Sequence, residues 1–180
     1  GTVDYGPYQR SALPDAERAA GKVLLCCATP LSDIEIEYEP LALPGKIPTQ
    51  TWLATVASLD LMAHDVMRVM LRLEGDRRIE FYAGQYINVV LDDGEKRAYS
   101  FATAPQVSDR IELQIRRIPN GRYSTHVFEK MKVGDRVLFE GPLGSFFLRE
   151  DSEKPIIFVA GSTGFAPVKS MVEYAFARGS

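Results

Sequence analysis

The run Arg97–Ser100 (RAYS) brings a cation, an aromatic ring and a hydroxyl close together. Alternate side chains of a strand share a face, so Arg97 and Tyr99 should point the same way. The forked donors of a guanidinium suit a phosphate, and a phenol ring can stack on a heteroaromatic plane. Ser100 faces the other way but adds a hydroxyl and a backbone N–H. Taken alone, the run also fits an edge strand with an exposed arginine and a half-buried tyrosine.

A second run, Gly121–Thr125 (GRYST), has the features of a phosphate-binding turn. Glycine lets the backbone approach a ligand closely, and Ser124 can cap the helix that is predicted to follow. The N-terminus of a helix offers free N–H groups, which attract a phosphate. The alternative interpretation of these residues is an ordinary capped helix after a turn.

Two further glycine-rich runs lie near the end of the sequence. Gly161–Pro167 (GSTGFAP) follows an apolar run and precedes a helical pattern. This context would place backbone N–H groups at the carboxyl end of a parallel strand, where nucleotides bind; a plain strand-to-helix turn is the alternative. The spacing is not G-x-G-x-x-G, so that fingerprint does not apply. Gly141–Phe146 (GPLGSF) predicts a tight structural turn.

Composition excludes several kinds of partner. The 180 residues carry a net charge of −3, which gives no broad basic field for nucleic acid. No apolar run approaches the roughly 18 residues of a membrane-spanning helix. Cys26 and Cys27 are the only cysteines, and because neighbours rarely form a disulfide, a reducing cytoplasm suits the chain. His64 and His126 show no metal-binding spacing.

The residues that must position these side chains, 49–150, consist of short β-rich runs separated by turn signals. Asp93-Gly94 between two of the runs is a strong hairpin signal. Six strands at this spacing predict an antiparallel barrel or sandwich, with one helix near Ser124–Met131. The six predicted strands are 51–59, 65–73, 85–91, 96–104, 110–118 and 136–141.

The residues before this region show little regular hydrophobic period. A helical pattern at 13–20 (LPDAERAA) is ended by a glycine. Lys22–Cys26 has the pattern of a buried strand, and Ile34–Tyr38 alternates like a half-buried one. The proline-rich residues 40–50 predict a linker, with a domain boundary near Pro44–Pro48.

The residues after the β-rich region predict one strand–turn–helix unit. Pro155–Ala160 is a continuous apolar run, typical of a parallel strand that is covered on both faces. Apolar residues at helical spacing follow the GSTG turn, and Pro167 suits the first turn of that helix. Such a unit cannot be a stable domain alone, and the sequence starts at Gly1 rather than Met, so we expect the protein to extend beyond both ends.

The order of the four runs resembles the ferredoxin–NADP reductase superfamily, in which RAYS corresponds to the FAD signature and GRYST to the pyrophosphate loop. The resemblance extends over essentially all 180 residues. It implies a mainly β fold, with a six-stranded antiparallel Greek-key barrel that binds FAD at 45–150. It also implies the start of a truncated α/β NAD(P)-binding domain at 151–180, with its first βα unit.

The same resemblance assigns roles to particular residues. Arg97 would pair with the FAD pyrophosphate, Tyr99 would stack on the flavin, and Ser100 would lie near flavin N5, where hydride arrives. Tyr99 and Ser100 are therefore the expected catalytic residues. Ile115 and Arg117 would line the cofactor from the next strand. Gly121, Ser124 and Thr125 would hold phosphate. Gly161, Thr163 and Gly164 would border the nicotinamide cofactor.

Residues 1–44 resemble the C-terminal part of a plant-type 2Fe–2S ferredoxin domain, whose last cluster cysteine maps to Cys26. The C-x4-C-x2-C run of such domains is absent. A 2Fe–2S cluster is therefore expected in the full-length protein and not in this chain. Adjacent residues on a strand point to opposite faces, so we expect Cys26 to ligate the cluster and Cys27 not to.

The resemblance implies a cytoplasmic flavoprotein oxidoreductase that passes hydride from NAD(P)H to FAD and then single electrons to a 2Fe–2S centre. Its layout is most like that of reductases serving a deoxysugar dehydrase. One alternative is the reductase component of a phenol, toluene or other aromatic-ring oxygenase. A second alternative is a non-catalytic barrel that binds a protein partner. The expected partners are NAD(P)H and an electron-accepting iron–sulfur, oxygenase or dehydrase protein, with no nucleic acid and no membrane.

Overall fold

The computed structural model describes residues 1–37, 45–152 and 154–179. The chain divides into two compact units, Gly1–Ala42 and Leu43–Ser180, and the division falls inside the proline-rich stretch. No helix in the described part of the chain is long and apolar enough to cross a membrane.

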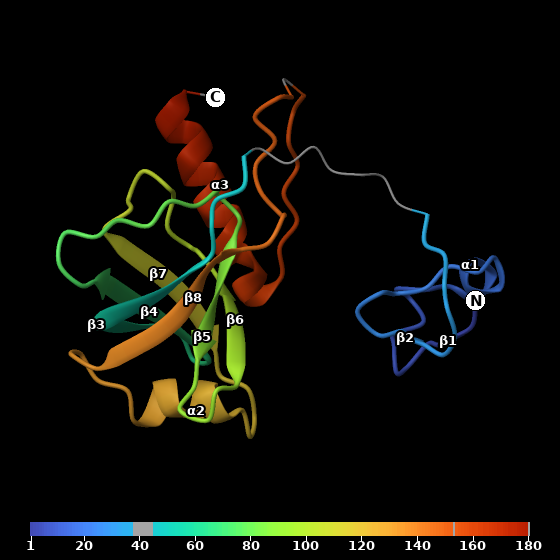
Figure 1. The fold of residues 1–180 in the computed structure, drawn as a ribbon, viewed down its shortest axis with the longest axis horizontal. Coiled ribbons are helices and arrows are strands. Elements are labelled where there is room, and N and C mark those ends of the chain that lie inside the picture. The colour runs from blue at the N-terminus through green and yellow to red at the C-terminus, as the bar shows by residue number, and fades with distance from the viewer. Residues whose placement is uncertain (38–44, 153, 180) are drawn as a thin grey trace. The chain divides into compact units, whose positions relative to one another are not determined.

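Six antiparallel strands form the main sheet of the second unit, in the order β6-β5-β8-β3-β4-β7. All six correspond to the β-rich runs between turn signals that predicted them, so the mainly β, six-stranded antiparallel prediction is confirmed. Figure 1 shows them wrapped around a common interior. The strands are β3 (Gln50–Ala63), β4 (Val66–Leu73), β5 (Tyr86–Val90), β6 (Lys96–Ser100), β7 (Arg110–Arg116) and β8 (Arg136–Leu143).

The core lies between the inner faces of these strands. On β7, Ile111, Leu113 and Ile115 are fully buried, and each such aliphatic side chain contributes about 1.5–3 kcal/mol by leaving water. Glu112 and Gln114, between them, are buried as well, so β7 is covered on both faces. The ladder does not close between the end strands β6 and β7, although just beyond β6 the Ala102 N–H donates to the Glu112 carbonyl at 2.9 Å.

The hairpin between β5 and β6 forms where Asp93-Gly94 predicted it. Gly94 has a φ of +83°, in the left-handed region that glycine adopts without strain. The Leu91 N–H donates to the Glu95 carbonyl at 2.8 Å, and the Asp93 side chain accepts from the Glu95 N–H at 3.1 Å. These bonds fix the register that pairs Arg97 with Val89.

Two helices accompany the sheet. α2 (Arg122–Glu129) lies across one end of the sheet, and α3 (Phe165–Arg178) lies towards the other end (Figure 1). A single 3-10 turn, η1 (Ser162–Gly164), leads into α3. Both helices occur where apolar residues at helical spacing predicted them, and both bury one side, including Val127 on α2 and Met171 on α3.

The strand predicted at Pro155–Ala160 is wrong for this structure. These residues pair with no strand in the described part of the chain, and Ile157 and Val159 are 88% and 92% exposed. A parallel strand is stable only between neighbours that satisfy its backbone N–H and C=O groups. The apolar composition of this run favours burial, but the described residues provide no neighbouring strands that would bury it.

The first unit has little regular structure. It contains β1 (Val3–Asp4) paired with β2 (Thr29–Pro30), and α1 (Asp15–Ala19) where a helix was predicted. The predicted buried strand at Lys22–Cys26 is wrong, because this segment ends in a turn with Leu25 70% exposed. Residues 34–37 are exposed and not in a strand, which corrects the second prediction; Tyr38 lies outside the described residues.

Candidate functional site

Arg97 and Tyr99 lie two residues apart on β6, and both are half-buried. The Arg97 guanidinium donates to Glu95 Oε2 at 2.7 Å and to the Lys96 carbonyl at 2.9 Å. Burial raises the pKa of Tyr99 to about 12, and the nearby charge of Arg97 opposes that shift. Ser100, the last residue of β6, is half-buried and pairs with Tyr86 on β5.

Tyr123 on α2 packs against Tyr99, with the ring centroids 5.7 Å apart. Tyr123 is only 8% exposed, and its hydroxyl has no hydrogen-bond partner among the residues that the structure describes. Burial, and then the neighbouring Tyr99 phenol, raises the pKa of Tyr123. The tyrosine pair thus joins β6 to the start of α2. Sequence reasoning missed Tyr123, although it lies inside the GRYST run.

No side chain caps the N-terminus of α2, and Tyr123 and Ser124 in its first turn are buried. Ser124 was predicted to be the cap, but it lies within the first turn of the helix, after the N-cap residue Gly121. Its hydroxyl instead accepts from the Ile118 N–H at 3.1 Å and donates back to the Gly121 carbonyl at 3.2 Å. A Cβ on Gly121 would lie 2.5 Å from the Ser124 hydroxyl oxygen, so this turn requires glycine.

A surface hollow of about 630 Å³ opens beside this turn. It brings together three predicted residues, Arg117, Gly121 and Thr125. The Arg117 guanidinium donates to Glu129 Oε1 at 2.5 Å. The side chain of Ile115, by contrast, is fully buried in the core, so it does not line this hollow.

The geometry fits the phosphates and the ring system of a flavin dinucleotide. Arg97 from β6 and Arg122 from α2 both reach Glu95 Oε2, so the two cations lie close to each other, and Arg122 is the first residue of α2 at its uncapped N-terminus. Such an N-terminus binds phosphate through its free N–H groups. The partly exposed Tyr99 ring on the same strand as Arg97 offers a stacking surface.

The GSTG turn lies at the start of α3, with Gly161 and Gly164 exposed and Thr163 half-buried. α3 is tied to the residues that directly follow RAYS. Lys169 donates to the Ala102 carbonyl at 3.0 Å and to the buried Glu112 carboxylate at 3.1 Å. Burial lowers the pKa of Lys169, but its bonds to Glu173 and Glu112 outweigh burial and raise it overall.

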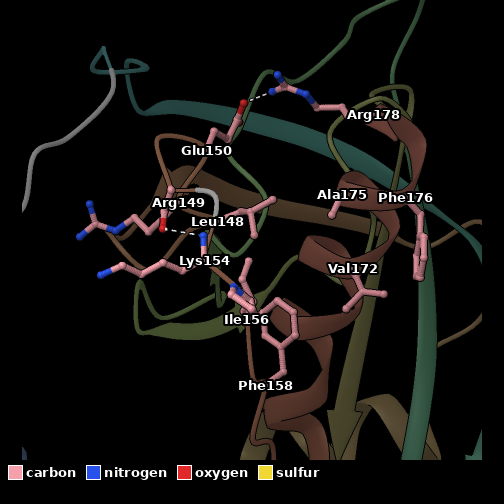
Figure 2. Close-up of a pocket in the computed structure, with 12 residues that line it drawn as sticks. Leu148, Arg149, Glu150, Lys154, Ile156, Phe158, Val172, Ala175, Phe176 and Arg178 are labelled. Carbon is pink, nitrogen blue, oxygen red and sulfur yellow. Dashed lines mark hydrogen bonds and ion pairs between the residues drawn. The ribbon is translucent and has the colours of Figure 1, made fainter. Parts of the chain in front are cut away.

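Another hollow, of about 590 Å³, lies away from all the predicted site residues. Figure 2 shows Ile156 and Phe158 on one side of it and Val172, Ala175 and Phe176 of α3 on the other. Its walls are mostly apolar, apart from charged groups at one end that include the Glu150–Arg178 ion pair. The apolar residues around this hollow are ones that the predicted α/β unit would need to bury.

The two cysteines lie in a turn, and their Sγ atoms are 3.6 Å apart. Both thiols therefore lie on one side of the backbone, which corrects the expectation that they point to opposite faces. Cys26 is exposed and Cys27 is half-buried. The hydrogen bond with Cys26 and then burial raise the pKa of Cys27. In the described residues, no three His, Cys, Asp or Glu side chains gather to hold a metal ion.

Residues 53–148 match the family model of the oxidoreductase FAD-binding domain. The chain is 39% identical to the CDP-6-deoxy-L-threo-D-glycero-4-hexulose-3-dehydrase reductase of Yersinia pestis, over 92% of this chain and 50% of that protein. It is 37% identical to the phenol 2-monooxygenase reductase component DmpP of Pseudomonas sp. (strain CF600), over 99% of this chain and 51% of that protein.

Among solved structures, phthalate dioxygenase reductase is similar, with a TM-score of 0.66 and 27% identity over 72% of this chain and 40% of that chain. That structure is described as modular, for electron transfer from pyridine nucleotides to a 2Fe–2S centre. The chain spans about half the length of the relatives it matches. The resemblance to deoxysugar-dehydrase and phenol-oxygenase reductases is confirmed.

Proposed function

Because the chain belongs to the oxidoreductase FAD-binding domain family, we propose that residues 45–150 hold FAD within a larger NAD(P)H-dependent reductase. The observation that carries this proposal is the convergence on Glu95 of Arg97 from β6 and Arg122, the first residue of the uncapped helix α2. Bound FAD supplies the chemistry of accepting two electrons as hydride and releasing them one at a time.

The chain's own residues would bind and orient the cofactor. Arg97 and the backbone at Gly121 would hold the phosphates, and Thr125 would add a hydroxyl at the edge of the same hollow. The Tyr99 ring would support the flavin, and Ser100 at the end of β6 would position a hydroxyl beside the reacting atom.

The segments on either side of the flavin region would take part in electron transfer to and from the flavin. Residues 151–180 would begin the NAD(P)-binding domain, where Gly161, Thr163 and Gly164 border the nicotinamide cofactor. Lys169 supports this assignment, since it connects α3 to residues just beyond Ser100. Residues 1–44 would end a 2Fe–2S ferredoxin domain whose remaining ligands come from a preceding segment. The two free thiols fit a cytoplasmic protein.

For the whole protein, we favour the reductase of a deoxysugar dehydrase as electron donor to that partner. The support is the 39% identity to the Yersinia pestis reductase. The reductase component of an aromatic-ring oxygenase is the second candidate, supported by the 37% identity to the phenol monooxygenase component. Supplying the full-length protein with NAD(P)H and each acceptor in turn separates the two, because only the true acceptor should be reduced rapidly.

Titration of the chain with FAD tests the flavin proposal directly. Binding should quench flavin fluorescence and give a yellow preparation, with FAD bound more tightly than FMN because two phosphate groups are contacted. A colourless chain that leaves added FAD free would instead favour a non-catalytic barrel that binds a protein partner.

A further inference from the structure

Four charged side chains, two arginines and two carboxylates, meet at the tip of the β5–β6 hairpin. Glu95 Oε2 accepts from the Arg97 guanidinium at 2.7 Å, and the Arg122 guanidinium approaches the same oxygen at 3.3 Å. Arg122 also donates to Asp93 Oδ2 at 2.6 Å. Two cations from different elements therefore converge on one carboxylate oxygen, directly beside the N-terminus of α2, whose first residue is Arg122.

This convergence differs from an ordinary surface ion pair. The pairs Arg116–Asp65 and Arg136–Glu74 each join one cation to one carboxylate. At Glu95, two guanidiniums are held near each other, and they would repel if the carboxylate between them were removed. Arg122 is also paired with Asp93 at 2.6 Å, so the two guanidiniums favour an anion between them without depending on Glu95 alone. A phosphate oxygen satisfies the same forked donors as a carboxylate oxygen.

We propose that Glu95 occupies the position of a cofactor phosphate and competes with it, and that Arg122 is a second phosphate-binding cation beside Arg97. This inference rests on the proposed function, because the phosphate is taken to belong to bound FAD. The side chains of Glu95, Arg97 and Arg122 are 50%, 40% and 59% exposed, so Glu95 can swing out to water when a phosphate replaces it. Two separate guanidiniums match the two phosphates of a dinucleotide.

The proposal predicts effects of opposite sign at two neighbouring residues. Glu95→Gln removes the competing charge and should tighten FAD binding by about 2- to 5-fold, the size expected for one exposed charge interaction. Arg122→Gln removes one phosphate contact and should weaken FAD binding by roughly 5- to 30-fold. Arg122→Gln should weaken FMN binding less, because a single phosphate can still be held by Arg97.

The experiment measures the dissociation constants of FAD and FMN for the chain by flavin fluorescence, at low and at high salt. Glu74→Gln and Arg116→Gln are matched controls, since each breaks an exposed ion pair elsewhere on the sheet, and both should bind FAD like the wild type. Both effects at Glu95 and Arg122 should shrink at high salt, because exposed charges are screened. Thermal unfolding without flavin should show that all four variants fold.

The inference is overturned if Glu95→Gln binds FAD no more tightly than the wild type, or if Arg122→Gln binds it equally well. Such results with a wild-type chain that binds FAD leave the flavin proposal intact. A wild-type chain that binds neither flavin would overturn the proposed function as well.

Discussion

Arg97 is the residue whose removal should affect the candidate site most. The Lys96 carbonyl orients its guanidinium, which already pairs with the Glu95 carboxylate, so it is arranged to bind an anion. We predict that Arg97→Ala weakens FAD binding by roughly 10- to 100-fold, the loss of one charge-assisted contact worth about 1.5–3 kcal/mol. Titration of the flavin-free chain with FAD measures this change in affinity. An unchanged FAD affinity in this variant would remove Arg97 from the phosphate site.

Tyr99 should make the stability of the folded chain fall at alkaline pH. Burial raises its pKa in the folded chain to about 12, against 10.0 for an ordinary tyrosine. The folded state therefore favours the neutral phenol. The resulting stabilisation is fully present below pH 10.0 and is lost as the pH rises through about 12. Tyr99→Phe should consequently lose less stability than the wild type across that window.

Unfolding of both proteins by urea at neutral and alkaline pH measures this difference. The difference in phenolate absorbance between wild type and Tyr99→Phe should titrate near pH 12. A difference that titrates at the ordinary tyrosine value would show that Tyr99 is more exposed than the structure places it.

Single residues show where reading the sequence succeeds and where it stops. Arg97 and Tyr99 were predicted to share a strand, and both lie on β6, because residue type and strand period are local properties. The contact between Arg122 and Glu95 was not predicted, because it joins a helix to a hairpin that lies 27 residues earlier. Ser124 was assigned to the helix N-cap although Gly121 holds that position, and such small shifts at helix ends are difficult to read from sequence.

At the level of elements, a predicted strand formed only where the chain supplies a neighbouring strand to pair with it. The six sheet strands alternate apolar and polar residues or are bounded by turn signals, and each found partners in the chain. Pro155–Ala160 is more apolar than most of them yet is unpaired in the described residues. An apolar run therefore indicated a need for cover, but only the surrounding chain decides whether a ladder forms.

Lys169 is one of the residues that attach α3 to the rest of its unit, beside the buried Ser170, whose hydroxyl donates to the Thr103 carbonyl at 2.6 Å. Its ammonium group bonds the Ala102 carbonyl and the Glu112 carboxylate, whose side chain is only 10% exposed. We predict that Lys169→Met lowers the free energy of unfolding by about 1.5–3 kcal/mol, because a mostly buried carboxylate loses its cation. Amide hydrogens of α3 should also exchange faster.

Lys96→Met is the matched control for this prediction. Lys96 pairs with Glu140 at 2.8 Å, but its side chain is 46% exposed, and such pairs contribute about 0–1 kcal/mol. Urea unfolding and hydrogen exchange of both variants make the comparison. Equal losses of stability in the two variants would show that the Lys169 cluster does not hold α3 in place.

At the scale of the whole molecule, the two units offer different kinds of information. Leu43–Ser180 contains the sheet, α2, α3 and the family match. Its β fold could be predicted from the pattern of the chain, whereas FAD binding was predicted from the resemblance of its four ordered runs. Gly1–Ala42 contains little regular structure. Its assignment to a ferredoxin domain rests on the resemblance of the segment around Cys26, since the remaining cluster ligands are not in this sequence.

Cys26 and Cys27 connect this unit to the proposed electron path in the full-length protein. We predict that Cys26→Ser abolishes a 2Fe–2S cluster there and that Cys27→Ser retains it. Four thiolates are needed, and the exposed Cys26 is accessible to a preceding segment, whereas Cys27 is half-buried. Because the two Sγ atoms are 3.6 Å apart, opposite strand faces no longer distinguish them, and exposure is the remaining structural difference.

Iron content and the EPR signal of the reduced cluster measure the outcome in both variants. Loss of the cluster only with Cys27→Ser would show that the half-buried thiol is the ligand, and that a rearrangement of the turn exposes it. A cluster that persists in both single variants, with Cys26→Ser/Cys27→Ser also loaded, would remove residues 1–44 from the ferredoxin assignment. In that case other residues of the full-length protein would hold the cluster that accepts electrons from the flavin.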